Sequence, residues 1–162
     1  MNNWKDVNDN LQEWRKYRTS PPNLELYKKI VSVVGLGKSI ADVGCGQQHL
    51  KQCLPDGHDY YGIDPFPIVP NTIKCKAEDL YTKFDTVFML ASLDNVESVK
   101  MALLGLKNCA KLNIVILTGI DIEPDKYHTH KITKEVLYKY MGKPLIEKEM
   151  LRNVYLFEWS VL

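Results

Sequence analysis

Two short apolar runs, separated by a helical pattern, constrain the fold of this chain most strongly. Residues 84–90 (FDTVFML) and 113–118 (NIVILT) are apolar over most of their length, without alternation of polar side chains. A strand of this kind is buried on both faces, as in a parallel sheet covered by helices. Between the runs, Val99, Leu103 and Leu106 recur at helical spacing and predict a helix over residues 96–109. Strand, helix and strand in this order predict a parallel crossover unit.

The rest of the chain continues this alternation of strands and helices. We expect further strands over residues 39–43, 60–64, 72–75, 146–149 and 155–161, and further helices over residues 3–18, 24–34, 48–53 and 133–140. Together they predict an α/β fold with a mainly parallel seven-stranded sheet and helices on both faces. Ligands of such sheets bind at the carboxyl ends of the strands, where the strand order reverses. Those strand ends are therefore the places to search for a site.

The amino-terminal segment carries one apolar stripe. Its members, at steps of three and four, are Trp4, Val7, Leu11, Trp14 and Tyr17. This spacing predicts a helix with one buried face. The pattern favours packing of that face on the sheet, and the alternative is that the helix covers a pocket.

Composition excludes several classes of function. The 162 residues carry a formal charge of +1, so no global basic field draws the chain to a nucleic acid or a membrane. No apolar run reaches the roughly 18 residues that span a bilayer, and the polar start does not resemble a signal peptide. Four separated cysteines form no CxxC pair, which disfavours zinc and indicates reduced thiols. We therefore expect a cytoplasmic chain with one domain over residues 1–162, no metal, and an undetermined oligomeric state.

The first predicted strand runs directly into a glycine turn, Asp42-Val43-Gly44-Cys45-Gly46. Two glycines one residue apart allow a sharp turn and a close approach to a ligand. A phosphate-binding P-loop is disfavoured because Ser32 occupies the position of its first glycine. A dinucleotide site, as in NAD-type oxidoreductases, is disfavoured because His49 stands where a third glycine packs helix against strand.

Four segments in register carry a more specific resemblance. They are Ala41-Asp42-Val43-Gly44-Cys45-Gly46, Tyr61-Gly62-Ile63-Asp64, Ala77-Glu78-Asp79-Leu80, and residues 84–88 running into Ala91-Ser92-Leu93-Asp94-Asn95-Val96. In this order and spacing the sequence resembles the small class I methyltransferases that use S-adenosylmethionine (SAM) and release S-adenosylhomocysteine (SAH). The resemblance covers residues 36–162, with residues 1–35 as a helical extension. It implies a Rossmann-like sheet with an antiparallel last strand, and methyl transfer to a small-molecule or sugar-like acceptor.

The resemblance also implies which residues hold SAM. Asp64, 22 positions after Asp42, would accept hydrogen bonds from the ribose hydroxyls. Pro65, Phe66 and Leu80 would form the adenine slot, and Asp79 would accept from the adenine amine. The turn of Gly44, Cys45 and Gly46, together with Ala91, would hold the amino acid end, and Asp42 would favour its ammonium electrostatically, through water.

One position departs from the family pattern. A third glycine is common at the position of Gln48, where a side chain could crowd the methionine end of SAM. This departure keeps open a second hypothesis, a catalytically degenerate domain that binds SAM weakly or serves as an interaction module.

Candidates on the acceptor side are fewer. His128 and His130 follow the fifth strand, and a histidine in this region lies near the substrate in similar small methyltransferases. Either could take a proton from an oxygen or nitrogen nucleophile. The alternative, which the residues favour, is that both lie on a surface loop or that one packs against the following helix. Asp94 and Asn95 could face the substrate cleft. The signature Asn-Pro-Pro-Tyr is absent, which disfavours methylation of nucleic acid bases.

Overall fold

The structure is a computed structural model that describes residues 4–17 and 24–161, with the backbone alone for residues 14–17. Its helices are α1 (Trp4–Tyr17), α2 (Leu24–Val31), α3 (Val99–Cys109) and α4 (Lys134–Met141), with the 3₁₀ turns η1 (His49–Cys53), η2 (Ala77–Asp79) and η3 (Leu93–Asn95). Its strands are β1 (Ser39–Val43), β2 (Asp59–Asp64), β3 (Ile73–Lys74), β4 (Phe84–Leu90), β5 (Ala110–Gly119), β6 (Ile146–Leu151) and β7 (Val154–Ser160).

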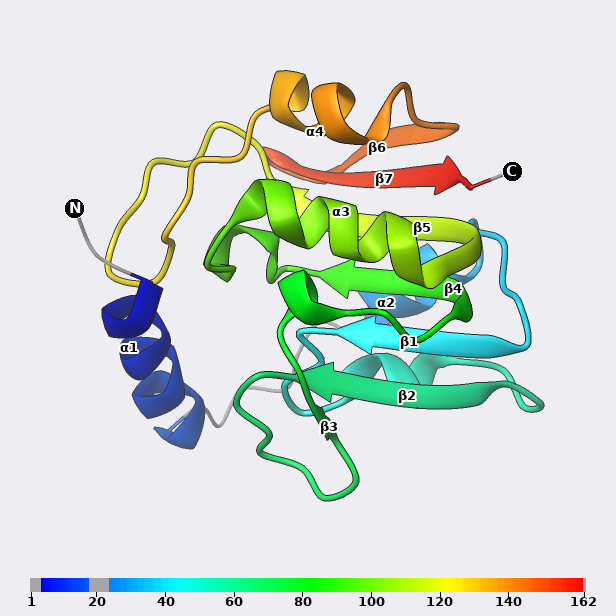
Figure 1. Cartoon of the computed structure of the whole chain (residues 1–162), viewed down its shortest axis with the longest axis horizontal. Coiled ribbons are helices and arrows are strands. Elements are labelled where there is room, and N and C mark those ends of the chain that lie inside the picture. Colours follow the sequence, from blue (N-terminus) through cyan, green and yellow to red (C-terminus); the bar gives the residue numbers. More distant parts are fainter. Residues whose placement is uncertain (1–3, 18–23, 162) are drawn as a thin grey trace.

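The seven strands form one sheet in the order β3-β2-β1-β4-β5-β7-β6. Strands β1 to β5 pair in parallel, whereas β7 is antiparallel to both β5 and β6. In Figure 1 the arrows of β1, β2 and β4 point toward α1, and β7 points the other way. The expected seven-stranded sheet with an antiparallel last strand is confirmed. The strand order reverses between β1 and β4, so these strands share the ligand-binding edge.

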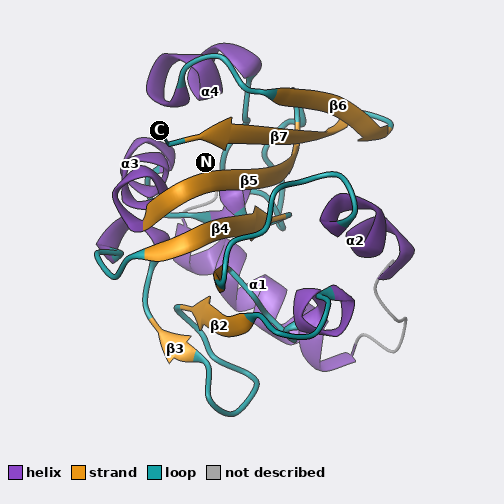
Figure 2. Cartoon of the chain, turned by 90° about the vertical axis from the view of Figure 1, so that its right-hand side faces the viewer, coloured by secondary structure: helices purple, strands orange, loops and turns teal. Residues whose placement is uncertain are grey.

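Helices cover both faces of the sheet, as Figure 2 shows. One core contains Leu103 and Leu106 of α3 and Leu137 of α4. The other contains Ile30 of α2 and Leu50 of η1. Strands β4 and β5 contribute to both cores because alternate side chains point to opposite faces. Their unbroken apolar sequences therefore report two-sided burial, as predicted.

Most element boundaries differ from the expected ones by one to three residues. Helix α3 begins at Val99, three residues late, because the Ser98 hydroxyl accepts from the Met101 N–H and caps the helix. Helix α2 ends at Val31, three residues early. Strand β5 begins at Ala110, directly after α3 and three residues before its apolar run. No described helix is long and apolar enough to cross a membrane.

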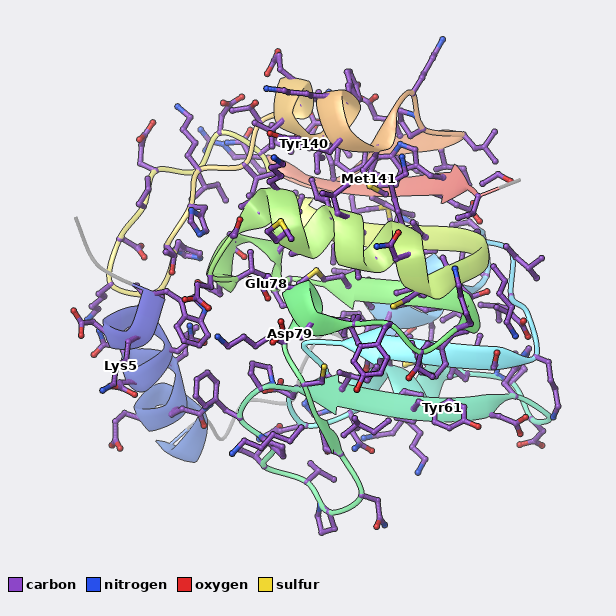
Figure 3. The ribbon with its side chains drawn as sticks, viewed as in Figure 1. Lys5, Tyr61, Glu78, Asp79, Tyr140 and Met141 are labelled. Carbon is purple, nitrogen blue, oxygen red and sulfur yellow. The ribbon has the colours of Figure 1, made fainter. Side chains whose placement is uncertain are left out.

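Helix α1 does not pack on a face of the sheet, so that prediction is wrong. It lies beside the carboxyl ends of β1, β2 and β4, at the left of Figure 1. Val7 is fully buried but belongs to neither core. The exposed Lys5, labelled in Figure 3, lies on this helix. The side chains of Trp14 and Tyr17 lie outside the described residues. The apolar stripe thus indicated a buried face without indicating which surface buries it.

Candidate functional site

A cavity of about 500 Å³ opens at the carboxyl ends of β1, β2, β4 and β5. Its size lies within the range of about 300–1,000 Å³ that is usual for small-molecule sites. Two groups of residues on different segments line it. We call the first the glycine wall: Val43, Gly44, Cys45, Gly46, Asp64, Pro65 and Ala91. We call the second the histidine wall: Trp4, Leu11, Asp94, Asn95, Ile122, Tyr127 and His128.

The glycine wall is shaped by a close approach of β1 and β4. Gly44 has φ +73°, and a Cβ atom at this position would lie 2.4 Å from the Ser92 Oγ. Ser92 donates to the Val43 carbonyl, and Ala91, at the end of β4, also has a positive φ of 54°. Only glycine allows both this backbone conformation and this proximity. The glycine signal in the sequence therefore reports a real steric requirement.

Asp64 lies at the end of β2, with both carboxylate oxygens oriented by the backbone. The Gly46 N–H donates to one oxygen at 3.0 Å, and the Phe66 N–H donates to the other at 2.8 Å. A carboxylate offers about four lone-pair directions, so each oxygen keeps one for a ligand. Asp64 is 3% exposed yet lines the cavity. It is an oriented acceptor for ligand hydroxyl groups.

The turn uses its own N–H groups internally. The Gly44 and Cys45 N–H groups both donate to the Ile63 carbonyl, at 2.8 and 3.1 Å. Burial raises the pKa of the Cys45 thiol to about 12, so the thiol stays protonated at neutral pH. The turn therefore offers a ligand its shape more than hydrogen-bond donors.

Asp42 lies beneath the turn and does not line the cavity. It is 4% exposed and accepts a 2.7 Å hydrogen bond from the Tyr60 hydroxyl. Burial raises the pKa of this carboxyl to about 7, with the Asp64 charge adding to the shift and the Tyr60 hydrogen bond opposing it. Because the β1 side chains alternate between faces, Asp42 points into the layer that holds η1 and Tyr60.

Gln48 does not crowd the cavity. It adopts the left-handed conformation, φ 59°, in which a glycine would be relaxed. Its side chain turns toward β2, where its amide donates to the Thr72 hydroxyl at 2.8 Å and lies beside Gly62. A Cβ atom on Gly62 would be 2.7 Å from the Gln48 Nε2, so Gly62 makes room for this side chain. The departure from the family pattern is thus accommodated away from the cavity.

The third lining segment comes from η2, but not from its predicted members. Lys76, Ala77 and Glu78 line the cavity, whereas Asp79 is exposed and Leu80 is buried in the core. Successive residues of a 3₁₀ turn point about 120° apart, which explains why Ala77, Glu78 and Asp79 differ in exposure. Glu78 and Asp79 are labelled in Figure 3, beside α3. The predicted roles of Asp79 and Leu80 are therefore not supported by their positions.

Helix α3 fixes η2 in place. A Cβ atom on Gly105 would lie 2.1 Å from the Ala77 carbonyl oxygen, so glycine alone lets α3 pack against this turn. The Glu78 carboxylate also accepts from the Ser98 N–H at 2.9 Å, one residue before α3 begins.

On the histidine wall, His128 lies between two carboxylates. Its Nδ1 is 2.7 Å from the Asp125 Oδ1, and its Nε2 is 3.6 Å from the Asp94 Oδ2. Burial raises the pKa of the Asp94 carboxyl. The pKa of the Asp125 carboxyl is lowered, most by the hydrogen bond from the Tyr127 N–H and less by the hydrogen bond from the His128 side chain. His130 points elsewhere, since its Nε2 is 2.8 Å from the Val96 carbonyl oxygen and it does not line the cavity. Of the two predicted histidines, only His128 reaches the cavity.

Helix α1 covers this wall. The Trp4 indole N–H donates to the Asn95 carbonyl at 2.9 Å, and the Asn8 amide donates to the same carbonyl at 3.3 Å. The Trp4 ring also packs against Phe66 with centroids 5.6 Å apart, and the Lys76 ammonium lies 4.9 Å from its centroid. Phe66 therefore supports Trp4 and does not itself line the cavity.

Comparison with known proteins gives results for structure alone. No protein-family model and no curated protein matches the sequence. Magnesium protoporphyrin IX methyltransferase from Synechocystis PCC 6803, solved with bound SAM, matches with a TM-score of 0.69 and 16% identity, over 99% of this chain and 97% of that one. The 1,6-didemethyltoxoflavin-N1-methyltransferase of Burkholderia thailandensis, solved with its substrate and SAH, matches with a TM-score of 0.73 and 13% identity, over 97% and 86%.

A further match is partial. A protein of an antibiotic biosynthesis pathway from Anabaena variabilis ATCC 29413 aligns with a TM-score of 0.52 and 18% identity, over 62% of this chain and 47% of that one. Two of these three matches extend along nearly the whole chain. The chain has the class I SAM-dependent methyltransferase fold. The predicted fold class is confirmed.

Within this methyltransferase fold, the cavity brings together six of the ten residues predicted to bind the cofactor. They are Gly44, Cys45, Gly46, Asp64, Pro65 and Ala91. The other four, Asp42, Phe66, Asp79 and Leu80, lie outside its lining. Among the described residues, no group of three or more histidine, cysteine or acidic side chains could hold a metal ion. Sequence reasoning missed Lys76 and Ile122, and it left the covering position of helix α1 as the less favoured alternative.

Proposed function

We propose that this chain is a SAM-dependent methyltransferase acting on a small molecule. The observation that carries the proposal is Asp64, a carboxylate at the ligand edge of the sheet with both oxygens oriented by backbone N–H groups. It would accept from the ribose hydroxyls, as charge-assisted hydrogen bonds. Pro65, Lys76 and Ala77 would hold the adenine, and the Gly44 turn with Ala91 would hold the amino acid end.

The remaining demand on the protein is positioning. When bound, SAM supplies a methyl group on a sulfonium, and the sulfur leaves as a neutral thioether without help from an acid. The histidine wall would hold the acceptor in line with that methyl group, and such alignment accounts for most of the barrier lowering in a transfer of this type. Helix α1 would exclude water from the cavity. His128 would take the proton that a protic acceptor loses.

A small acceptor agrees with the size of the cavity and with the relatives. Two of the solved structures that match along nearly the whole chain are, as their names state, methyltransferases of a magnesium porphyrin and of a toxoflavin precursor. This parallel supports a small-molecule acceptor for the present chain.

Calorimetric titration with SAM and SAH tests the proposal. We expect micromolar binding, and we expect Asp64→Asn to weaken it about 100-fold, because two charge-assisted hydrogen bonds are lost while one acceptor for the backbone remains. Asp59→Asn, an exposed acid at the opposite end of β2, is the matched control and should bind normally. Absence of heat with either ligand, in a folded protein, would contradict the proposal and support the interaction module. Binding of NAD instead would support an oxidoreductase.

A further inference from the structure

We infer that the methyl acceptor is a small amine with an apolar body, held by Asp94 and Asn95 and deprotonated by His128. This inference rests on the proposed methyltransferase function and adds the chemical class of its acceptor. It depends on three independent features of the histidine wall: its charge, the geometry of His128, and a buried oxygen atom that lacks a partner.

The charge of the cavity disfavours an anionic acceptor. Asp94 lines the histidine wall with its side chain 17% exposed. Among the described lining residues, Lys76 is the only lysine or arginine, and its ammonium is already paired with the Glu97 carboxylate at 2.5 Å. A carboxylate or phosphate on the acceptor would therefore face acids without a free cation. An ammonium would instead gain a charge-assisted hydrogen bond to Asp94.

The geometry of His128 fixes which nitrogen is basic. The ionised Asp125 carboxylate only accepts hydrogen bonds, so the His128 Nδ1, at 2.7 Å, carries the hydrogen. The Nε2 is then the nitrogen with the free lone pair. It lies 3.6 Å from the Asp94 Oδ2, too far for a direct hydrogen bond. A ligand amine can therefore donate one N–H to the Nε2, which acts as the base, and another N–H to the Asp94 carboxylate, which anchors the amine.

Asn95 supplies the third feature. Its side-chain oxygen Oδ1 is buried and has no hydrogen-bond partner among the described residues, although Asn95 lines the cavity. Its backbone carbonyl is already used by Trp4 and Asn8. A buried acceptor without a donor is destabilising, and a ligand N–H would supply the donor that Asn95 lacks. An amine carries several N–H groups and can satisfy Asn95 and Asp94 together.

Apolar side chains surround this polar group. Leu11 and Trp4 come from α1, and Ile122 comes from the segment after β5. They provide a surface for an apolar or aromatic body but no further charge.

The chemistry of transfer to an amine balances with these residues. The bound ammonium gives one proton to the His128 Nε2, which leaves a neutral amine with a free lone pair. That lone pair forms the new nitrogen–carbon bond, while the bond from the methyl carbon to sulfur breaks and its electron pair stays on sulfur. The methylated product leaves as an ammonium, and His128 returns its proton to solvent.

Three probes of similar size test the inference: phenethylamine, 2-phenylethanol and 3-phenylpropionate. Their binding is measured by ligand-observed NMR, first on the free protein and then on the protein saturated with SAH. We expect phenethylamine to bind at least tenfold more tightly than 3-phenylpropionate in both states, with the alcohol between them. Equal binding of the three, a preference for the carboxylate, or no binding of the amine would overturn the inference.

Variants separate this inference from the proposed function. Asp94→Asn should remove most of the preference for the amine and leave SAH binding within about threefold. Glu123→Gln is the matched control, because Glu123 is an exposed acid near the same wall that pairs with Lys131 and does not line the cavity. An unchanged order of the probes in Asp94→Asn would also overturn the inference. Failure of SAH to bind would instead contradict the proposed function, whatever the order of the probes.

Discussion

The two walls of the cavity are built in different ways. The glycine wall is made by adjacent strands whose main-chain groups bond to one another, as in the two N–H groups that share the Ile63 carbonyl. The histidine wall is assembled from segments far apart in the chain. The hydrogen bond from Trp4 to Asn95, which joins two of them, spans 91 positions. The glycine wall is thus part of the sheet, whereas the histidine wall is a set of contacts between separate segments at the carboxyl ends of the strands.

This difference determines what each wall can tolerate. Changes at the glycine wall alter the strands that carry it, so stability and cofactor binding should change together. Changes at the histidine wall should alter acceptor binding while the sheet stays intact. The following predictions test this separation.

The largest expected effect concerns Asp42, beneath the glycine wall. Its pKa is about 7 in the folded protein against 3.8 in a model compound, since burial disfavours the charged form. A raised pKa of an acid means that its stabilising contribution is complete below about pH 4 and is lost as the pH rises to about 7. At about 1.4 kcal/mol per pKa unit, the loss is about 4 kcal/mol. Asp42→Asn should remove this loss, so the variant gains stability over the parent between pH 4 and pH 8.

Urea unfolding of both proteins across this pH range measures the effect, and the difference between them cancels the contributions of other groups. Tyr60→Phe is the companion variant. It deletes the hydrogen bond that opposes the shift, so the loss of stability should continue to higher pH and become larger in total. Parallel pH curves for the parent and Asp42→Asn would show that Asp42 titrates alike in the folded and unfolded chains.

Gly44→Ala should have the next largest effect. The new methyl group would lie 2.4 Å from the Ser92 Oγ, and the positive φ adds strain. We expect a destabilisation of about 3 kcal/mol from overpacking and backbone strain together, accompanied by loss of SAH binding. Gly57→Ala is the matched control, since Gly57 has φ +94° but no atom within 4 Å of the added methyl group. It should cost about 1 kcal/mol and leave binding unchanged. Equal costs for the two variants would mean that the contact with Ser92 is not restrictive.

The difference between the two walls also explains which parts of the fold and of the cavity could be predicted from the sequence. The glycine turn and Asp64 were predicted because their requirements are local: a backbone conformation in one case, and the end of a strand in the other. The apolar runs of β4 and β5 fixed the sheet for a similar reason, since burial on both faces leaves a pattern in consecutive residues.

The histidine wall left no such pattern. The stripe on α1 predicted a buried face. Which surface buries it depends on hydrogen bonds to Asn95, which lies 91 positions from Trp4 in the sequence. Asp79 was expected at the adenine from the family resemblance, yet the rotation of the 3₁₀ turn brings Glu78 to the cavity instead. His128 and His130 are two positions apart, and only the path of their loop distinguishes them.

Trp4→Ala tests the histidine wall at an intermediate size of effect. It removes the indole N–H to Asn95 and the contact with Phe66, which together hold α1 over the cavity. We expect phenethylamine binding to weaken about tenfold, or about 1.4 kcal/mol, while SAH binding changes less than threefold. Trp4→Phe keeps a ring but loses the N–H donor, so its affinity for phenethylamine should lie between those of the parent and Trp4→Ala. A loss of SAH binding as large as the loss of amine binding would show that the two walls are not separable.

Asn95→Leu should have the smallest effect, and its two consequences have opposite directions: higher stability and weaker binding of the amine. The buried Asn95 Oδ1 lacks a partner among the described residues, so replacing the amide by an apolar side chain of similar size should raise the free energy of unfolding by about 1 kcal/mol. The same variant should bind phenethylamine more weakly, because the unpaired acceptor is what the amine satisfies. Asn8→Leu is the matched control, since the Asn8 amide already donates to the Trp4 and Asn95 carbonyls and its loss should destabilise α1. A destabilised Asn95→Leu would mean that Asn95 serves the fold, and the acceptor site would then depend on Asp94 and His128 alone.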